Sequence, residues 1–437
     1  MIRGGVILNP VSSKSLRIAY CLPELYPHES GKSAGMDAAY LQQLYISSGL
    51  QARGHQLTYL SPINLREMVY TFDLKTIKPV PRSWTRTGWF DYLSRGIWRL
   101  QRAMGIPYLN VFSNLRYFDA CVQCFPGHDL VQERYSLYNV GVAMACRKLN
   151  LPYILFFDAD QLMELDYLGE PITGLLRRRA TQILRYNLRV ARGVICVSDQ
   201  SKVHLINHWK IPEKKIAVFP NAVDVERFKP DPRARLRTRA SLGIETNPII
   251  LFVGNFYKWH DLVTLLKAFR EVVVSHPETR LVLVGDGPER QVMMQLTTEL
   301  GLSESVIFTG LVNHEDIPGL INSADIAVAP IPLLETELWL SPMKIYEYMA
   351  SGVAVVATAS GQVMEVIRNG VNGWLVSPGD QSGMAKSIIY LIENPDLRLK
   401  LGEQARQDAI TRHSWIKYIE RLENFYIDLL AHTNLRK

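Results

Sequence analysis

The chain has 437 residues, of which 47% are hydrophobic and 21% are charged, the composition of a soluble globular protein. Its length exceeds what one hydrophobic core supports, so we expect two domains of roughly 200 residues each. No apolar run approaches the roughly 18 residues that a membrane span needs, and the first residues lack the apolar core and cleavage site of a signal peptide.

The five cysteines show no disulfide-framework spacing, so we expect reduced thiols in a cytoplasmic protein. Cys121 and Cys124 form a C-x-x-C pair in a segment whose apolar composition predicts a buried strand. No second pair completes a zinc site, and we interpret both residues as core thiols rather than as metal or redox groups.

The first half of the chain alternates between strand and helix patterns. Strands are predicted at residues 16–21, 56–60, 117–125, 153–157 and 193–197, and helices at residues 36–53 and 136–149. A polar loop containing Gly31 and Gly35 follows the first strand, and we expect it to approach a ligand cleft. Its residues Ser30 to Ser33 resemble the end of a Walker A loop, but Tyr26 stands where that motif needs a glycine, which argues against a P-loop.

The second half repeats the same rhythm after a polar bridge that contains prolines. Strands are predicted at residues 249–254, 280–284, 306–309, 326–329 and 353–357, and helices at residues 262–275, 289–300 and 315–323. This order predicts an α/β protein with two doubly wound, Rossmann-like domains, residues 1–215 and 216–413, and a helix at 414–430 that returns to the first domain. Such sheets bind ligands at the carboxyl ends of their strands, so we expect a cleft between the domains.

Residues 338–380 are the most informative segment. Ser341 and Pro342 predict a helix start, with a capping hydroxyl followed by a proline that needs no partner for its nitrogen. Lys344 lies in the first turn, where a helix amino terminus and a cation together favour a diphosphate. Glu347, one turn deeper, is an acceptor suited to sugar hydroxyls, and Tyr348 shares the same face. The alternative is a surface acid paired with a solvated lysine.

A glycine turn lies between the predicted strand at 280–284 and the helix that follows it. Gly285 and Gly287 form a G-x-G pattern there, which alone is weak because many α/β domains need such glycines for steric reasons only. Asn221 and Asp224, near the start of the second half, are interpreted as turn formers.

Taken in chain order, these motifs resemble the retaining glycosyltransferases of family 4, which have the GT-B fold. The motifs stand at residues 218–230, 252–269, 281–289, 307–330 and 338–380, with weaker likeness at residues 52–60 and 128–159. The resemblance implies transfer of a hexose from a UDP- or GDP-linked sugar to a glycan or a lipid-linked acceptor, with no metal and no other cofactor. Because the departing diphosphate helps to deprotonate the acceptor, the mechanism needs positive charge at the leaving group.

The resemblance also implies roles for individual residues. Catalytic roles fall to Lys258, Lys344 and Glu347. The donor would be held by Gly254, Asn255, His260, Gly285, Gly287, Val312, Ser341, Pro342, Tyr348 and Glu365. The acceptor side would include Gly31, Gly35 and Asp158. Glu365 has an equally good interpretation as a first-turn acid favoured by its helix dipole.

The chain departs from the family pattern at three positions. Asn255 stands where relatives usually carry an arginine, and His260 stands where they usually carry a lysine. Relatives also carry a glutamate eight positions before Glu347, where this chain has Trp339. Glu335 and Glu337 are the nearest acids that could replace it.

Two rival functions therefore stay open. One is a UDP-sugar epimerase of the same fold, which would need paired acids and a histidine for elimination across the sugar ring. The other is a scaffold protein that binds a nucleotide sugar without turnover, a hypothesis that the departures favour.

Two basic segments of the first half suggest contact with an anionic membrane. Residues 82–102 interleave five arginines with tryptophans, and residues 177–192 form a second basic run. The alternative is a solvated helix face with aromatic packing. No nucleic-acid motif accompanies the charge, so we expect no nucleic-acid partner.

Overall fold

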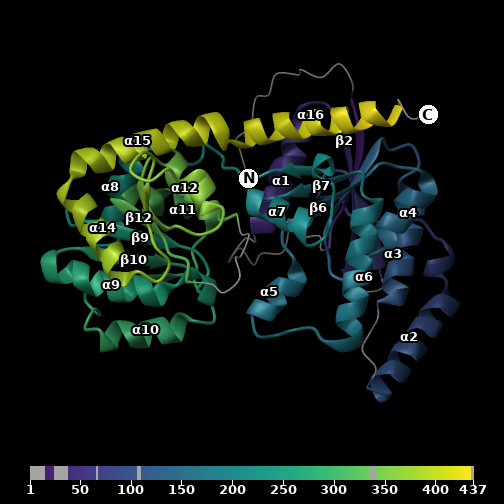
Figure 1. Cartoon of the computed structure of the whole chain (residues 1–437), viewed down its shortest axis with the longest axis horizontal. Helices are drawn as coiled ribbons and strands as arrows, with labels where there is room; N and C mark the ends of the chain where they lie inside the picture. The colour runs from purple at the N-terminus through teal and green to yellow at the C-terminus, as the bar shows by residue number, and fades with distance from the viewer. Residues whose placement is uncertain (1–14, 24–37, 65–66, 106–109, 334–340, 435–437) are drawn as a thin grey trace. The chain divides into compact units, whose positions relative to one another are not determined.

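The computed structural model describes residues 15–23, 38–64, 67–105, 110–333 and 341–434. The chain divides into two compact units (Figure 1). Of the described residues, the amino-terminal unit comprises 15–23, 46–64, 67–105, 110–219 and 419–434. The carboxy-terminal unit comprises 38–45, 220–333 and 341–418.

An eight-stranded sheet forms the centre of the amino-terminal unit, in the order β4-β3-β2-β1-β5-β6-β7-β8. Its strands are β1 (Arg17–Cys21), β2 (Gln56–Asn64), β3 (Glu67–Thr71), β4 (Lys78–Pro79), β5 (Leu130–Arg134), β6 (Tyr153–Phe157), β7 (Gly193–Cys196) and β8 (Ile216–Val218). All neighbours pair in parallel except β3 and β4, which extend the sheet by antiparallel pairing.

Helices α3 (Val111–Cys124), α4 (Gly141–Leu149), α6 (Gly174–Val190) and α7 (Asp199–Asn207) share one hydrophobic cluster with this sheet. The unit also contains α2 (Gly88–Ala103) and α5 (Gln161–Tyr167). Two further helices, α1 (Ala38–Ala52) and α16 (Trp415–Asn434), each cross the division between the units.

The predicted strand at 117–125 is wrong, because this segment lies in α3. Its buried residues Tyr117, Ala120 and Cys121 recur at helical spacing, so the apolar run has a period of 3.6 rather than the continuous burial of a strand. All five cysteines are free; Cys121 is buried and Cys124 is half-buried. The neighbouring strand β5 is one of the strands that the sequence analysis missed, together with β3, β4, β8 and the later strand at residues 374–376.

The carboxy-terminal unit is built on a six-stranded, wholly parallel sheet in the order β11-β10-β9-β12-β13-β14. Its strands are β9 (Ile249–Val253), β10 (Arg280–Val284), β11 (Val306–Gly310), β12 (Ile326–Ala329), β13 (Ala354–Thr358) and β14 (Trp374–Val376). Its helices are α8 (Pro232–Ser241), α9 (Leu262–Ser275), α10 (Arg290–Glu299), α11 (Ile317–Ser323), α12 (Met343–Ala350), α13 (Val363–Val366), α14 (Gln381–Glu393) and α15 (Pro395–Arg412).

Burial on both faces explains the uninterrupted apolar strands of this sheet. Along β9, Ile249 and Leu251 face one hydrophobic cluster, whereas Ile250 and Phe252 face another on the opposite side. A parallel sheet covered by helices on both faces has this pattern. The predicted class, two doubly wound α/β sheets, is confirmed.

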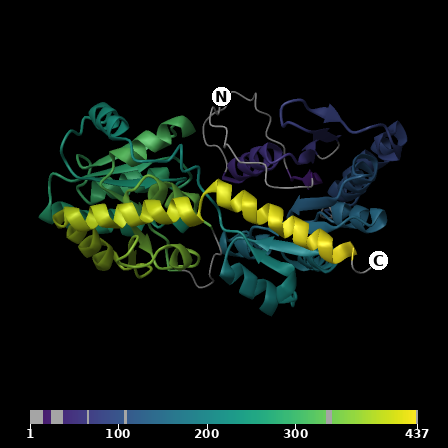
Figure 2. The ribbon, with the colours of Figure 1, turned by 90° about the horizontal axis from the view of Figure 1, so that it is seen from above.

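Strand β8 and helix α16 show where the boundary between the two units falls. β8 pairs with β7, so the first sheet extends past the predicted boundary at residue 215, and the division falls at Phe219. α16 runs along the amino-terminal unit (Figure 2). There Glu423 accepts hydrogen bonds from Arg53 at 2.7 Å and contacts the ring of His55 at 2.9 Å.

Candidate functional site

The amino-terminal end of α12 is held by tertiary hydrogen bonds and not by a local cap. Pro342 occupies the N-cap position, and no side chain caps the helix. The Ser341 hydroxyl instead accepts a hydrogen bond from the backbone amide of Asn221 at 2.9 Å. The Asn221 side-chain amide donates to the Ser341 carbonyl at 2.7 Å. The predicted capping role of Ser341 is therefore wrong, and Ser341 instead ties α12 to the segment that opens this unit.

Lys344 extends from the first turn of α12 toward the carboxyl end of β9. Its Nζ lies 4.1 Å from the centre of the Phe252 ring and 3.3 Å from Nδ1 of His260. A side-chain carbon at Gly254 would come within 2.6 Å of this Nζ, so a larger residue there would displace the ammonium. Burial lowers the pKa of Lys344 to about 7, although Glu347 opposes the shift. The lysine is thus poised to gain a proton when an anion arrives.

His260 is a neutral neighbour of this lysine. Burial, followed by the charge of Lys344, holds the pKa of the His260 ring well below its usual value. The ring therefore accepts a hydrogen bond and contributes no positive charge at neutral pH.

Glu347 is a nearly buried carboxylate, with 9% of its surface exposed. Burial raises its pKa to about 7, and the positive charges of Arg227 and Lys344 oppose that rise. Among the described residues, none forms a hydrogen bond or ion pair with its side chain. Since buried polar groups in proteins are nearly always paired, an uncommitted carboxylate between two cations is suited to accept hydrogen bonds from a ligand.

Arg227 is a residue of this site that the sequence analysis missed. Its guanidinium donates to the carbonyl of His314 at 2.7 Å and lies near enough to Glu347 to lower that pKa. The sequence signal that could have identified it is the segment VDVERF at residues 223–228. In the structure, Asp224 accepts hydrogen bonds from the amides of Glu226 and Arg227 at 3.1 Å each. This turn confirms Asp224 as a turn former and fixes the backbone of the arginine.

Tyr348 does not face the site. Its side chain is completely buried, and its hydroxyl accepts a hydrogen bond from the backbone amide of Val253 at 2.8 Å. The predicted contact with a donor is therefore corrected to a structural role, the attachment of α12 to β9.

The glycines after β9 and β10 allow two backbone segments to approach closely. A side-chain carbon at Gly285 would lie 2.1 Å from the carbonyl oxygen of Gly254, and one at Gly287 would lie 2.6 Å from that of Phe256. The amides of Gly254 and Gly285 donate to the carbonyls of Val284 and Gly310. The steric interpretation of the G-x-G pattern thus holds, and these two amides are committed to the protein.

We expect Gly285→Ala to destabilise the protein by about 3 kcal/mol or more, because the added carbon meets backbone and φ is +132°. Gly301→Ala is the matched control. Its φ of +71° is also unfavourable for alanine, but nothing lies within 4 Å, so the expected loss is only about 1 kcal/mol. Urea denaturation of both variants measures the difference, and equal losses would contradict the close approach.

The remaining residues predicted for this site differ in exposure. Lys258 and Asn255 are exposed, and among the described residues none forms a hydrogen bond or ion pair with the Lys258 side chain. Val312 packs partly buried against the core, and Glu365 is exposed on the short helix α13. Lys344 therefore supplies the buried cation of the site. Gly31, Gly35, Glu335, Glu337 and Trp339 lie outside the described residues.

A second group of charged residues lies at the carboxyl ends of β5 and β6 in the amino-terminal unit. Asp158 pairs with Arg134, whose Nε and Nη2 approach one carboxylate oxygen at 2.9 and 2.6 Å. Burial and the charges of Asp158 and Asp160 raise the pKa of Glu164 to about 7. Tyr138 adopts a positive φ of 66°, a strained conformation for a non-glycine residue. Strain and perturbed carboxyls at this sheet edge are typical of a ligand site.

Two family descriptions match this chain and together cover most of it. Glycosyltransferase Family 4 matches residues 43–227, and Glycosyl transferases group 1 matches residues 235–408.

Curated relatives include several enzymes that handle sugars. The chain is 27% identical over 248 residues to N-acetyl-alpha-D-glucosaminyl L-malate synthase of Bacillus anthracis, a match that covers 57% of this chain and 62% of the relative. It is 28% identical over 206 residues to a GDP-mannose-dependent mannosyltransferase of Mycolicibacterium smegmatis that acts on phosphatidylinositol monomannoside, covering 47% and 54%. It is 31% identical over 245 residues to D-inositol 3-phosphate glycosyltransferase of Corynebacterium jeikeium, covering 54% and 57%. The chain thus spans about three fifths or less of the length of these relatives.

Solved structures share the fold over nearly the whole chain. HepE from Anabaena in complex with UDP has a TM-score of 0.66 at 19% identity, covering 94% of this chain and all of that one. WaaG, a glycosyltransferase involved in lipopolysaccharide biosynthesis, has a TM-score of 0.60 at 17% identity, covering 94% and 99%. At these identities the comparison establishes the fold alone.

Proposed function

Because the chain belongs to glycosyltransferase family 4, we propose that it transfers a hexose from a UDP- or GDP-linked sugar to an acceptor hydroxyl with retention of configuration. The observation that supports this proposal is that α12 carries both a buried lysine and a buried carboxylate with which no described residue forms a hydrogen bond or ion pair. Lys344 matches the charge of a diphosphate, and Glu347 matches hydroxyl donors of a nucleotide sugar.

In the proposed reaction, Lys344 stabilises the charge that develops on the diphosphate as the bond to the sugar breaks. A cation held in place before the reaction stabilises this charge without reorganisation, which is a large term in enzymatic catalysis. The neutral His260 leaves the lysine as the dominant cation and accepts one of its protons in a hydrogen bond. Glu347 would accept hydrogen bonds from hydroxyls of the donor and so fix its orientation.

We assign recognition of the acceptor to the carboxyl edge of the first sheet. Arg134 and Asp158 offer a donor and an acceptor for sugar hydroxyls, and Glu164, with a pKa of about 7, can hold or release a proton near neutral pH. The names of two relatives include phosphatidylinositol monomannoside, which is lipid-linked, and D-inositol 3-phosphate, which is not, so we keep both a lipid-linked acceptor and a glycan as candidates here.

A donor screen tests the proposal. The protein is incubated with UDP- and GDP-linked hexoses, with and without a pool of glycan and lipid-linked acceptors, and nucleotide release is measured together with the anomeric form of the product. Turnover that needs an acceptor and gives a retained product supports the transferase. Conversion of the donor without nucleotide release would favour the epimerase, and binding without any turnover would favour the scaffold protein.

We expect transfer to proceed without a divalent metal. Within the described part of the chain, no cluster of three or more histidine, cysteine, aspartate or glutamate side chains could hold a metal ion, and Lys344 offers a cation at the leaving group. The rate should be the same in excess EDTA as in added magnesium or manganese. Activity that disappears in EDTA and returns with manganese would contradict this expectation.

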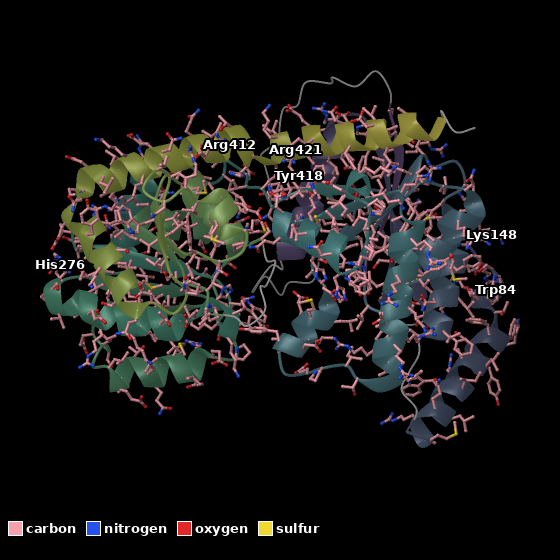
Figure 3. The ribbon with its side chains drawn as sticks, in the orientation of Figure 1. Trp84, Lys148, His276, Arg412, Tyr418 and Arg421 are labelled. Atoms are coloured by element: carbon pink, nitrogen blue, oxygen red, sulfur yellow. The ribbon has the colours of Figure 1, made fainter. Side chains whose placement is uncertain are left out.

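We also propose that α2 docks on an anionic membrane. Only Phe90 and Ser94 of this helix are buried, whereas Trp89, Tyr92 and Leu100 are 59, 83 and 57% exposed. Figure 1 shows α2 at the margin of its unit, and Trp84, just before it, lies at the same margin (Figure 3). No helix of the described residues is long and apolar enough to cross a bilayer. Exposed aromatic residues interleaved with arginines are typical of a helix that lies in a membrane interface.

Changing Arg95, Arg99 and Arg102 together to serine should weaken binding to anionic vesicles by roughly 100-fold, since each cation contributes about 1 kcal/mol. Arg86 is left in place because its guanidinium donates to the carbonyl of Val80. A variant with Arg233, Arg237 and Arg270 changed to serine removes the same charge elsewhere and should bind normally. Co-sedimentation with anionic and neutral vesicles at rising salt measures the effect. Equal binding to both vesicle types would contradict the proposal.

A further inference from the structure

A pocket of about 320 Å³ opens on the amino-terminal unit, away from the edge that carries Arg134 and Asp158. Arg17 and Gln56, which line it, are the first residues of β1 and β2, whereas Arg134 is the last residue of the parallel strand β5. The pocket therefore lies at the amino-terminal ends of the parallel strands, whereas the proposed acceptor site lies at their carboxyl ends. Its volume is at the low end of the range of about 300–1,000 Å³ that is usual for ligand pockets.

Two aromatic rings form one wall of this pocket. Tyr70 and Phe72, at the end of β3 and just after it, meet edge to face with ring centres 5.6 Å apart. Phe72 is 51% exposed although it lines a pocket. Such a ring offers an apolar platform on which the C–H face of a sugar ring can pack, and aromatic walls are common in ligand pockets.

Three polar side chains of the lining can still form hydrogen bonds to a ligand. Among the described residues, none forms a hydrogen bond or ion pair with the side chains of Arg17, Gln56 or Gln123. The two carboxamides can both donate and accept, as sugar hydroxyls require. The absence of a side chain at Gly127 leaves room for the Arg17 guanidinium, whose Nη1 would lie 3.1 Å from a carbon placed there.

Charged groups of both signs lie near the pocket, but its lining contains one cation, Arg17, and no carboxylate. His128 lies between the hydroxyl of Thr58 at 2.9 Å and the carbonyl of Phe125 at 3.2 Å, and burial lowers its pKa, so it is neutral. Asp129 accepts the backbone amide of Arg17 at 2.7 Å. Lys78 lies 5.9 Å from the centre of the Phe72 ring and adds a second cation to the rim. Cys124 is uncharged, because burial raises the pKa of its thiol to about 12.

We propose that this pocket binds an acidic saccharide, a sugar residue that carries a carboxylate or a phosphate ester, at a site separate from sugar transfer. The aromatic wall matches the face of the sugar ring, the carboxamides match its hydroxyls, and Arg17 with Lys78 matches the anion. Binding at this site is measured without turnover, so it is tested independently of the proposed transferase activity.

The test titrates the full chain with D-glucuronate, glucose 6-phosphate, glucose and inorganic phosphate, followed by calorimetry and ligand-observed NMR. The protein is compared with Arg17→Gln and Phe72→Ala, which alter exposed side chains. Arg147→Gln and Tyr92→Ala, at exposed positions elsewhere in the same unit, are the matched controls. Glu347→Gln is included to separate this pocket from the α12 site, and thermal melts confirm that each variant is folded.

We expect millimolar binding of the two acidic sugars, about tenfold tighter than that of glucose. Arg17→Gln should abolish this preference, and Phe72→Ala should weaken every sugar, whereas the controls and Glu347→Gln should bind as the native protein does. Failure of the native protein to bind, affinities unchanged by both pocket variants, or loss of binding in Glu347→Gln would each overturn the proposal. Inorganic phosphate that binds as tightly as the acidic sugars would reduce the site to a simple anion pocket and overturn it as well.

Discussion

Replacing Lys344 with methionine is expected to lower kcat/KM for transfer by about 10²–10³-fold, the loss that follows removal of one preorganised group that stabilises transition-state charge. Methionine is unbranched and only one atom shorter than lysine, and its thioether can pack against the Phe252 ring in place of the ammonium, so the fold should persist. Lys267→Met, an exposed change on α9, is the control and should retain native activity. Activity within a few-fold of native in a folded Lys344→Met protein would refute the role.

The same lysine predicts how donor binding depends on pH. In the free protein, burial lowers the pKa of Lys344 to about 7, and a bound diphosphate should raise it because the ammonium gains an opposite charge. Binding is therefore strongest below pH 7 and should weaken by up to about tenfold per pH unit above it. Titrations of UDP and GDP between pH 6 and 9 measure this slope. In Lys344→Met this fall with rising pH should disappear, and the remaining pH dependence should be that of Glu347, whose pKa is also about 7 and whose carboxylate is the better acceptor when it is ionised.

The second large effect is expected for Glu347→Gln, which keeps the shape of the side chain and removes its charge. Loss of charge-assisted hydrogen bonds to the donor should cost about 2 kcal/mol, or roughly 30-fold in kcat/KM. The melting temperature should stay the same or rise, because glutamine avoids burial of an unpaired carboxylate. Activity and stability should thus change in opposite directions.

Glu304→Gln, at an exposed position of the same unit, controls for the loss of a negative charge and should leave both quantities unchanged. A folded Glu347→Gln protein with full activity would exclude the carboxylate from donor binding. A fall in melting temperature together with activity would instead indicate a structural role.

Most strands of the carboxy-terminal unit and several of its helices could be predicted closely, because their signals are local, but β14, α8, α14 and α15 were missed, and α8 lies in the segment interpreted as a polar bridge. The predicted bounds of the helix at 262–275 and of the strands at 280–284 and 326–329 agree with those of the structure. The helix at 262–275 has an apolar face of helical period, whereas the two strands are short, uninterrupted apolar runs, and each signal is contained in one segment. The prediction for α3 was wrong because its apolar residues are too numerous to show one period. Its residues 117–125 contain so many apolar side chains that the period of burial cannot be separated from a continuous run.

The candidate site was predictable only where one segment of sequence supplies it. Lys344 and Glu347 lie in one helix, so their spacing indicated a shared site before any tertiary contact was known. Arg227 comes from a segment 120 positions earlier than Glu347, and its proximity depends on how the chain folds. Tyr348 was misplaced because helical spacing does not distinguish the face toward β9 from the face toward a ligand.

The hydrogen bonds between Asn221 and Ser341 determine which segments of the chain must be moved together to transfer the α12 motif to another protein. Residues 341–348 alone would carry the lysine and the glutamate but not their orientation, since the helix has no cap of its own and its first turn is fixed from Asn221. A chimera that receives only this motif should therefore lack donor affinity, whereas one that also receives residues 220–228 should gain it. The smallest portable form of this site is thus two separate segments of the chain.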